Sequence, residues 1–361
     1  MTLRRQSIRL GRRQFMLAIG SVTSMGAALL ASCGSDSAAG TAAETTSGPD
    51  ESAPDLSAAT PADTVAEPGA VTVTSDLAYG ANTTIGGAQQ ILTMDVYTPP
   101  DRGDNSLALL VLLPGGAFQP MTDKANLAGF AAALARQGLV VACINYRTFD
   151  GSGGITNPII KTLLIQGMQD ARAAVRFLSL DAGAGNRFDI DPTQIFLGGH
   201  SAGAMVSGHA VYLDDASKAD PEFQAIIAAE GGLDGTSGNS DGNSGGSVAV
   251  AGWIDLAGSL LDKRYITPGS PPMLGVYGTA DNIMPFGDAA FAVADLGTGR
   301  DIIAPVPVSG TRSLYDQAIA QGLTGSALYA ISGGDHFVPA AAANAECLTR
   351  IAAFIRSARR S

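Results

Sequence analysis

Histidine, cysteine and basic residues are scarce in this chain of 361 residues, and each scarcity limits its chemistry. There are three histidines and three cysteines, and 33 acidic residues outnumber 22 lysines and arginines. Five of the arginines lie within residues 1–32 and seven of the acids within residues 33–70, so residues 71–361 carry a net charge of −9. Contacts to phosphates require a basic surface, and this charge therefore argues against nucleic acid as a partner.

The cysteines allow at most one internal disulfide if Cys33 has another use. Cys143 lies in an apolar, strand-like run, and Cys347 lies in an amphipathic segment near the C-terminus. In an exported protein these two could form a disulfide, or they could be buried apolar thiols. The sequence leaves both options open.

Residues 1–32 contain no acidic residue. Five arginines within residues 4–13 precede an apolar stretch over residues 15–30. This arrangement is typical of an export signal, and the apolar stretch is too short to be read first as a membrane span. The segment GRRQFML is similar to a twin-arginine signal, and LASC, which ends at Cys33, is similar to a bacterial lipobox. We expect a twin-arginine lipoprotein-type signal peptide over residues 1–32 and a lipid anchor on Cys33. An ordinary signal peptide is the alternative.

Residues 33–70 consist mainly of Ala, Ser, Thr, Pro, Gly and acidic residues, without lysine, arginine or any aromatic residue. Such a segment cannot bury enough apolar surface to offset the entropy lost on ordering. We therefore predict a disordered acidic tether, which would hold residues 71–361 near a bacterial membrane on the exported, extracytoplasmic side.

Strand-like and helix-like segments alternate along the rest of the chain. Residues 107–113 and 139–146 are continuous apolar runs, as expected for strands buried on both faces, whereas residues 92–97 alternate like a half-exposed strand. Helical spacing predicts helices over residues 123–137 and near 348–355. The alternation predicts one α/β domain, with a mostly parallel central sheet and helices on both faces.

The pattern Gly-x-Ser-x-Gly occurs three times, centred on Ser201, Ser240 and Ser244. Only Ser201 follows a short apolar run, residues 193–197, that the turn pair Asp191-Pro192 introduces, and only Ser201 precedes small apolar residues that suit a helix. A strand that turns sharply into a helix exposes the serine at its apex as a nucleophile. The other two serines lie in a Gly/Ser/Asn/Asp tract, where we expect a loop.

A nucleophilic serine needs a general base, and only three histidines are available. His200 occupies a variable position of the pattern and would point away from Ser201. His209 would lie inside the following helix as a packing residue. His336 comes shortly after the apolar run 327–331, at the carboxyl end of the last predicted strand, where catalytic groups of α/β sheets gather. We predict His336 as the base.

The base needs an acid that orients it, and several aspartates are candidates. Asp281 comes directly after the predicted strand 273–277, and the order Ser, Asp, His is the one used by this type of fold. Asp335 is the main rival, although adjacent side chains rarely hydrogen-bond each other. Asp255 and Asp234 are further options. We predict Asp281 as the acid.

The loop after the buried run 107–113 reads PGGAF, residues 114–118. Glycines allow N–H groups to converge on one oxygen atom, as an oxyanion hole requires. We predict that the backbone N–H of Ala202 and donors from this loop bind the oxyanion. A plain tight turn is the alternative.

Taken together, these motifs resemble the α/β-hydrolase carboxylesterases and lipases of the hormone-sensitive-lipase and type-B carboxylesterase kind, over about residues 88–358. The segments that carry the resemblance are LTMDVYTP (92–99), PGGAF (114–118), QDARAAVR (169–176), DIDP (189–192), GHSAG (199–203), GTAD (278–281) and GDH (334–336). The resemblance implies an α/β-hydrolase fold with Ser201, Asp281 and His336 as the triad. It also implies that the N–H groups of Gly116, Ala117 and Ala202 donate to the oxyanion. The usual His-Gly-Gly-Gly is PGGA here, so the support of that first histidine is absent.

We predict neither a cofactor nor a metal. The spacing Asn239-x-Asp241-x-Asn243 is similar to a calcium loop, but the required Gly and Glu of an EF-hand are missing. The sequence thus favours a serine carboxylesterase that forms an acyl-enzyme with a small-molecule or polymeric ester, with a lean to short or medium acyl groups. A peptidase or amidase with the same triad, and a catalytically inactive surface binding module, are the alternatives.

Overall fold

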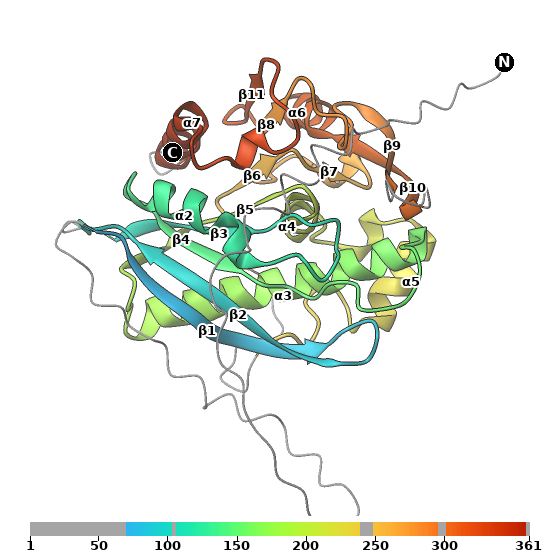
Figure 1. The fold of residues 1–361 in the computed structure, drawn as a ribbon, viewed down its shortest axis with the longest axis horizontal. Helices are drawn as coiled ribbons and strands as arrows, with labels where there is room; N and C mark the ends of the chain where they lie inside the picture. The colour runs from blue at the N-terminus through green and yellow to red at the C-terminus, as the bar shows by residue number, and fades with distance from the viewer. Residues whose placement is uncertain (1–69, 103–105, 239–247, 295–300, 359–361) are drawn as a thin grey trace, which may run out of the picture. The chain divides into compact units, whose positions relative to one another are not determined.

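A computed structural model describes residues 70–102, 106–238, 248–294 and 301–358 (Figure 1). The predicted signal peptide, Cys33 and nearly all of the predicted tether lie outside these residues, as do Ser240, Ser244 and the calcium-like spacing at 239–243.

An eight-stranded sheet forms the centre of the described fold, in the order β1-β2-β4-β3-β5-β6-β8-β11. The β1–β2 and β2–β4 pairs are antiparallel, and all the other pairs are parallel. The predicted mostly parallel sheet is therefore confirmed. The strands are β1 (Thr72–Thr83), β2 (Gln89–Thr98), β3 (Leu107–Leu113), β4 (Val140–Ile144), β5 (Ile190–His200), β6 (Gly252–Leu256), β8 (Met273–Gly278) and β11 (Ala327–Ile331).

Helices cover both faces of this sheet, as predicted (Figure 1). On one face, α2 (Ala128–Ala135) and α7 (Ala345–Ala358) share a buried apolar cluster with the strands. On the other face lies the larger cluster, to which the other α-helices of the described ranges contribute. These are α3 (Asn157–Ala184), α4 (Ala202–Tyr212), α5 (Pro221–Ala229) and α6 (Thr311–Ala320).

Two local predictions are wrong in detail. The expected half-exposed strand is β2, but its polar Asp95 is buried because Lys124 Nζ lies 2.7 Å from Asp95 Oδ1. The expected turn Asp191-Pro192 lies inside β5, where Leu107 pairs with Ile190 but Leu109 pairs with Ile195. The extra residues of β5 bulge out of the ladder, and a bulge tolerates proline because no N–H is needed there.

A second, three-stranded antiparallel sheet has the order β7-β10-β9 and was not predicted. Its strands are β7 (Ser259–Leu260), β9 (Asp288–Ala294) and β10 (Asp301–Gly310), and the β9–β10 hairpin lies between β8 and α6 in the chain. The predicted helix over residues 123–137 is a short 3₁₀ turn, η2 (Lys124–Leu127), followed by α2. Further 3₁₀ turns are η3 (Ala216–Lys218), η4 (Lys263–Tyr265) and η5 (Val338–Ala340).

A buried ion pair joins Arg147, three residues after the end of β4, to Asp170 on α3. Arg147 and Asp170 are 2% and 0% exposed, and their side chains lie 2.9 Å apart. Ser237 Oγ donates to the same carboxylate at 2.6 Å, so the segment around Ser237, which follows α5 in the chain, is held against α3. A buried charge is tolerated only when it is paired and hydrogen-bonded, and this carboxylate meets that condition.

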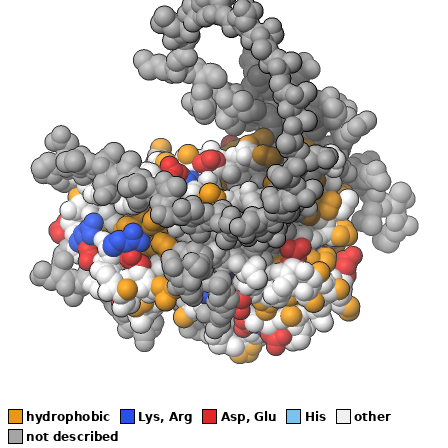
Figure 2. Space-filling view, turned by 90° about the horizontal axis from the view of Figure 1, so that it is seen from below, with side chains coloured by type: hydrophobic (Ala, Val, Ile, Leu, Met, Phe, Trp, Pro, Cys, Tyr) orange, Lys and Arg blue, Asp and Glu red, His pale blue; other side chains and the backbone are white. Residues whose placement is uncertain are grey.

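The described residues also answer the open question of the disulfide. Cys143 and Cys347 are both buried and free, so they form no disulfide. No helix in the described ranges is long and apolar enough to span a membrane. On the face drawn in Figure 2, acidic side chains are spread among apolar and uncharged ones, and the largest groups of visible basic atoms lie at its left side.

Candidate active site

Ser201 lies at a sharp turn where β5 leads directly into α4. Its φ is 55° and its ψ is −121°, a conformation that non-glycine residues rarely adopt. A Cβ on Gly199 would come within 2.4 Å of the Gly203 backbone, and one on Gly203 within 2.2 Å of the Leu113 carbonyl oxygen. The two flanking glycines therefore allow the close backbone approach that this turn requires.

Asp281 and His336 are in direct contact. His336 Nδ1 lies 2.8 Å from Asp281 Oδ2, and both side chains are almost fully buried. The other carboxylate oxygen, Oδ1, accepts hydrogen bonds from the N–H groups of Ile283 and Met284 at 2.8 and 2.9 Å. This fixed carboxylate can hold the imidazole in one orientation with its Nδ1 protonated.

Three hydrogen bonds join the segment that carries Asp281 to the segment that carries His336. The Thr279 N–H donates to Ile331 O at 3.0 Å, and the Ala280 N–H donates to Gly334 O at 2.8 Å. In the opposite direction, the Gly333 N–H donates to Thr279 Oγ1 at 2.8 Å. The contact between the two side chains thus rests on main-chain segments that are themselves tied together.

The rival acids have other partners. Asp335 Oδ1 accepts from the N–H groups of Phe337 and Val338, so it caps the turn that follows it. Asp234 lies 3.1 Å from the guanidinium of Arg172. Asp255 is fully buried at the end of β6 and accepts from the Gly258 N–H, and burial raises its pKa to about 7.

His209 is buried inside α4, as expected for a packing residue. Its Nδ1 lies 2.7 Å from Met205 O, and its Nε2 accepts from the Leu261 N–H at 3.3 Å. Because both ring nitrogens are occupied in this way, the ring has no free nitrogen to act as a base. Burial lowers its pKa to about 4.

Within the described residues, no hydrogen bond joins Ser201 Oγ to His336. The adjacent residue, His200, brings the two segments together: its ring centroid lies 4.9 Å from that of His336. Catalytic hydrogen bonds are often long without substrate and tighten in the substrate complex. The structure therefore joins the predicted acid to the predicted base and leaves the serine hydroxyl unbonded.

The predicted oxyanion loop has an unusual backbone. Gly116, Ala117 and Phe118 have φ values of 150°, 53° and 58° in succession. The loop is held from outside, because Tyr146 Oη donates to Pro114 O at 2.9 Å and the Phe149 N–H donates to Phe118 O at 2.7 Å. The loop is thus held by these contacts, although Pro114 stands in place of the first histidine of the usual His-Gly-Gly-Gly.

The predicted oxyanion donors carry free N–H groups. In the described part of the chain, neither the Gly116 nor the Ala117 N–H donates to a protein acceptor. The N–H of Ala202 belongs to the first turn of α4, where no intrahelical acceptor exists. The hydroxyl of Thr122 also lies against this loop, because a Cβ on Gly116 would come within 2.4 Å of Thr122 Oγ1.

Two contacts of the site were not predicted. His200 Nε2 lies 2.8 Å from the backbone oxygen of His336, and Tyr146 Oη donates to Pro114 O in the predicted oxyanion loop. The only sequence signal for Tyr146 is its place at the end of a buried run. For His200 there was no signal, because its partner is 136 residues away in the chain.

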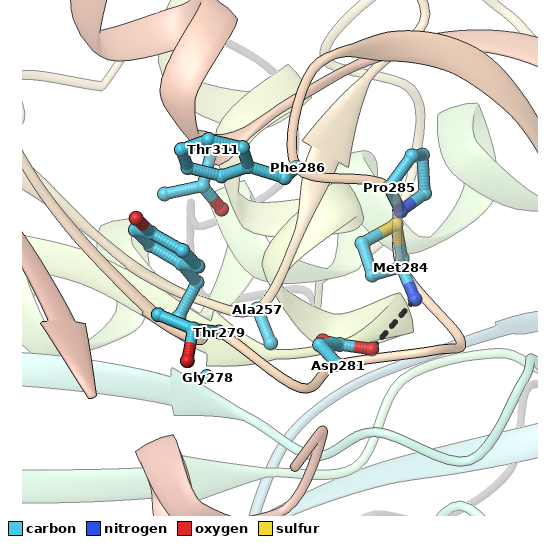
Figure 3. Close-up of a pocket in the computed structure, with 9 residues that line it drawn as sticks. Ala257, Gly278, Thr279, Asp281, Met284, Pro285, Phe286 and Thr311 are labelled. Carbon is cyan, nitrogen blue, oxygen red and sulfur yellow. Dashed lines mark hydrogen bonds between the residues drawn. The ribbon is translucent and has the colours of Figure 1, made fainter. Parts of the chain in front are cut away.

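A pocket of about 180 Å³ borders Asp281 (Figure 3). The rings of Tyr277 and Phe286 stack beside it with their centroids 4.3 Å apart, and Phe286 is 43% exposed. The lining is completed by Ala257, Gly278, Thr279, Met284, Pro285 and Thr311. Neither Ser201 nor His336 lines this pocket. In the described ranges, no group of three or more His, Cys, Asp or Glu side chains could hold a metal ion.

Comparison with known families and proteins gives a consistent picture. The BD-FAE family model matches residues 94–294, more than half of the chain. "Probable isoprenylcysteine alpha-carbonyl methylesterase ICME" of Oryza sativa subsp. japonica is 33% identical over 132 residues, 37% of this chain and 28% of that protein. The corresponding ICMEL2 protein of Arabidopsis thaliana is 31% identical over 119 residues, 33% of this chain and 25% of that protein. The matched part of the chain thus spans only about a quarter of these curated relatives.

Solved structures share the fold at low sequence identity. A truncated carbohydrate esterase from gut microbiota is 17% identical with a TM-score of 0.53, covering 82% of this chain and 99% of that one. Propionate-bound esterase 2 of Thermogutta terrifontis is 17% identical with a TM-score of 0.51, covering 78% and 94%. At these identities the similarity establishes the α/β-hydrolase fold.

The elbow geometry predicts a large effect of a single methyl group. We expect Gly203→Ala to lower the free energy of unfolding by about 3 kcal/mol or more, because its Cβ would lie 2.2 Å from the Leu113 carbonyl oxygen. Gly183→Ala, on α3, is the matched control, since nothing lies within 4 Å of its added Cβ, and it should stabilise slightly. Urea unfolding measures both. Equal stabilities of the two variants would contradict the close approach at the elbow.

Proposed function

The chain belongs to the BD-FAE family of α/β-hydrolase esterases, and from this premise we propose that it is a serine carboxylesterase with Ser201, His336 and Asp281 as its triad. The observation that carries the proposal is the 2.8 Å contact between His336 Nδ1 and Asp281 Oδ2 beside a nucleophile elbow. The proposed base and the proposed acid are thus already in the contact that their roles require.

In the proposed reaction, Ser201 Oγ attacks the ester carbonyl carbon while His336 Nε2 takes the hydroxyl proton. The carbonyl oxygen becomes an oxyanion, to which the free N–H groups of Gly116, Ala117 and Ala202 donate. The carbon–oxygen ester bond then breaks, and the alcohol leaves with the proton from His336. Water then attacks the carbonyl carbon of the acyl-enzyme while His336 takes a proton from it. The bond between this carbon and Ser201 Oγ breaks, the acid leaves, and Ser201 Oγ receives the proton from His336. Asp281 stabilises the imidazolium throughout.

We further propose that the substrate presents a short or medium apolar group. Six large hydrophobic side chains of the described residues are exposed, and three of them lie on segments that carry proposed site residues. Phe337 follows His336, with the two ring centroids 5.4 Å apart, Phe286 lies near Asp281, and Met121 lies on the segment after the oxyanion loop. An exposed apolar rim of this kind suits the apolar part of an ester. The preference for short and medium groups rests on the sequence, in which no long apolar lid insertion is evident.

The location is a separate proposal. We propose that the chain is exported and that a lipid on Cys33 anchors it to a bacterial membrane, with residues 34–70 as a tether. The support is the sequence of residues 1–33, with its paired arginines, apolar stretch and LASC motif.

The nucleophile is tested first. We expect Ser201→Ala to lower kcat for p-nitrophenyl acetate on the order of 10⁶-fold, because no acyl-enzyme can form. Ser240→Ala and Ser244→Ala carry the same change in the other two pattern matches and should stay close to wild type. A stable Ser201→Ala variant that kept its activity would refute the assignment. A folded wild-type protein without activity on esters or amides would favour a binding module.

The acid can be separated from its rival by one conservative change at each position. Asp281→Asn should lower kcat by roughly 10⁴-fold, because the amide would hold the wrong tautomer of His336. Asp335→Asn should retain activity, because Asp335 Oδ1 caps the next turn and the asparagine oxygen can accept the same bonds. Steady-state kinetics decide between them, and the reverse ranking would make Asp335 the acid.

The apolar rim predicts a change in substrate affinity. We expect Phe337→Ala to raise KM for p-nitrophenyl butyrate roughly 4- to 15-fold, the equivalent of one or two buried methylene groups. Leu180→Ala removes a similarly exposed side chain from α3, near the end that leads to the start of β5, and should leave KM unchanged. A series of p-nitrophenyl esters from C2 to C16 measures both, and a maximum at C12 or longer would contradict the short-chain proposal.

The anchor predicts a change of compartment. After Cys33→Ala, the protein should move from the membrane pellet to the soluble exported fraction, and the mass of the lipid should disappear from its N-terminal peptide. Cys143→Ala is the matched control, because that thiol is buried in β4. Membrane association that survives Cys33→Ala would rule out the lipid on Cys33.

A further inference from the structure

His200, the residue directly before the proposed nucleophile, makes a specific polar contact with the segment of the proposed base. Its side chain is buried, and its Nε2 lies 2.8 Å from the backbone oxygen of His336. A carbonyl oxygen can only accept, so Nε2 must carry the hydrogen. In the neutral ring, Nδ1 is then unprotonated.

The opposite side of the same ring faces the oxyanion loop. A Cβ on Gly115 would lie 2.8 Å from His200 Nδ1 and 3.0 Å from the Cβ of Ser201. Gly115 therefore leaves the space that the ring and the serine occupy. The ring is also 4.9 Å from that of His336 and 6.0 Å from that of Phe337, centroid to centroid. Three segments with proposed catalytic roles thus meet at His200.

The ring is neutral under ordinary conditions. Burial and, to a smaller extent, the positive charge that His336 can carry lower its pKa to about 4. A neutral ring adds no repulsion when His336 becomes an imidazolium during the reaction. His200 is therefore not a second charged group beside the serine.

We propose that His200 is a positioning residue: its Nε2–H holds the main chain of His336 so that the imidazole of His336 stays in line with Ser201. The inference rests on the proposed esterase function and deepens it. His336 is then fixed at two points, at its ring by Asp281 and at its carbonyl by His200. Without the second contact, the base can drift from the serine while its bond to Asp281 persists.

Two variants test the hydrogen bond. His200→Leu removes the donor and keeps an apolar side chain, and it should lower kcat roughly 10- to 100-fold with little change in KM. His200→Gln places an N–H near the position of Nε2 and should recover most of that loss. Urea unfolding of both variants supplies the folded fraction for correcting kcat. Equal activity of His200→Leu and wild type would overturn the proposal, as would a glutamine variant no better than the leucine one.

A measurement on the unmodified protein covers the case in which His200→Leu does not fold. In the ¹⁵N spectrum at neutral pH, His200 should have an unprotonated Nδ1 and a protonated Nε2, with a coupling from Nε2 across the hydrogen bond to the carbonyl of His336. Protonation on Nδ1 would overturn the proposal. The outcome is independent of catalysis: if the wild-type protein hydrolyses no ester, the proposed function fails, and the spectrum still decides the hydrogen bond of His200.

Discussion

The candidate site depends on backbone segments that approach each other more closely than a Cβ atom would allow. A side chain on Gly203 would meet Leu113 O at 2.2 Å, and one on Gly278 would meet Gly334 O at the same distance. The first approach brings the elbow against the start of the proposed oxyanion loop, and the second brings the segment of Asp281 against that of His336. Since catalytic groups must be placed within fractions of an ångström, these contacts decide whether the site can form at all.

Polar groups at the site are held in place before any substrate binds. One oxygen of Asp281 accepts from two main-chain N–H groups, which aims the other oxygen at His336. The proposed oxyanion loop, residues 114–118, has Ala117 and Phe118 at positive φ, and the hydroxyl of Tyr146 holds Pro114 at its start. Strained backbone of this kind persists only when its surroundings fix it. Groups fixed in advance need not reorganise as charge develops, which is the main source of electrostatic catalysis.

Much of the fold could be predicted because its signals are local. The unbroken apolar run 107–113 is β3, and the helical spacing near the C-terminus is α7. The choice of Ser201 among three matches likewise rests on the strand that precedes it. The choice of Asp281 over Asp335 rests on the strand before Asp281, on the order Ser, Asp, His, and on the adjacency of Asp335 to His336. The contact of Asp281 with His336 follows from topology, because the carboxyl ends of β8 and β11 are neighbours.

The rest depends on contacts that no local pattern records. β9 is rich in alanine, so its apolar pattern is weak, and it becomes a strand by pairing with β10. The burial of Asp95 depends on Lys124, and the hydrogen bond of His200 depends on a carbonyl 136 residues away. Asp191-Pro192 has the composition of a turn but lies in a bulge of β5, because the neighbouring β3 continues the ladder past it.

The most direct test of Ser201 as nucleophile is covalent labelling of the wild-type protein with a fluorophosphonate, followed by peptide mass spectrometry. The reagent needs an activated serine and phosphonylates its Oγ with loss of fluoride. We predict a single adduct, on the peptide that contains Ser201, and a labelling rate that falls sharply in His336→Ala. A folded protein that stays unlabelled, or one labelled at Ser240 or Ser244 instead, would contradict the proposed site.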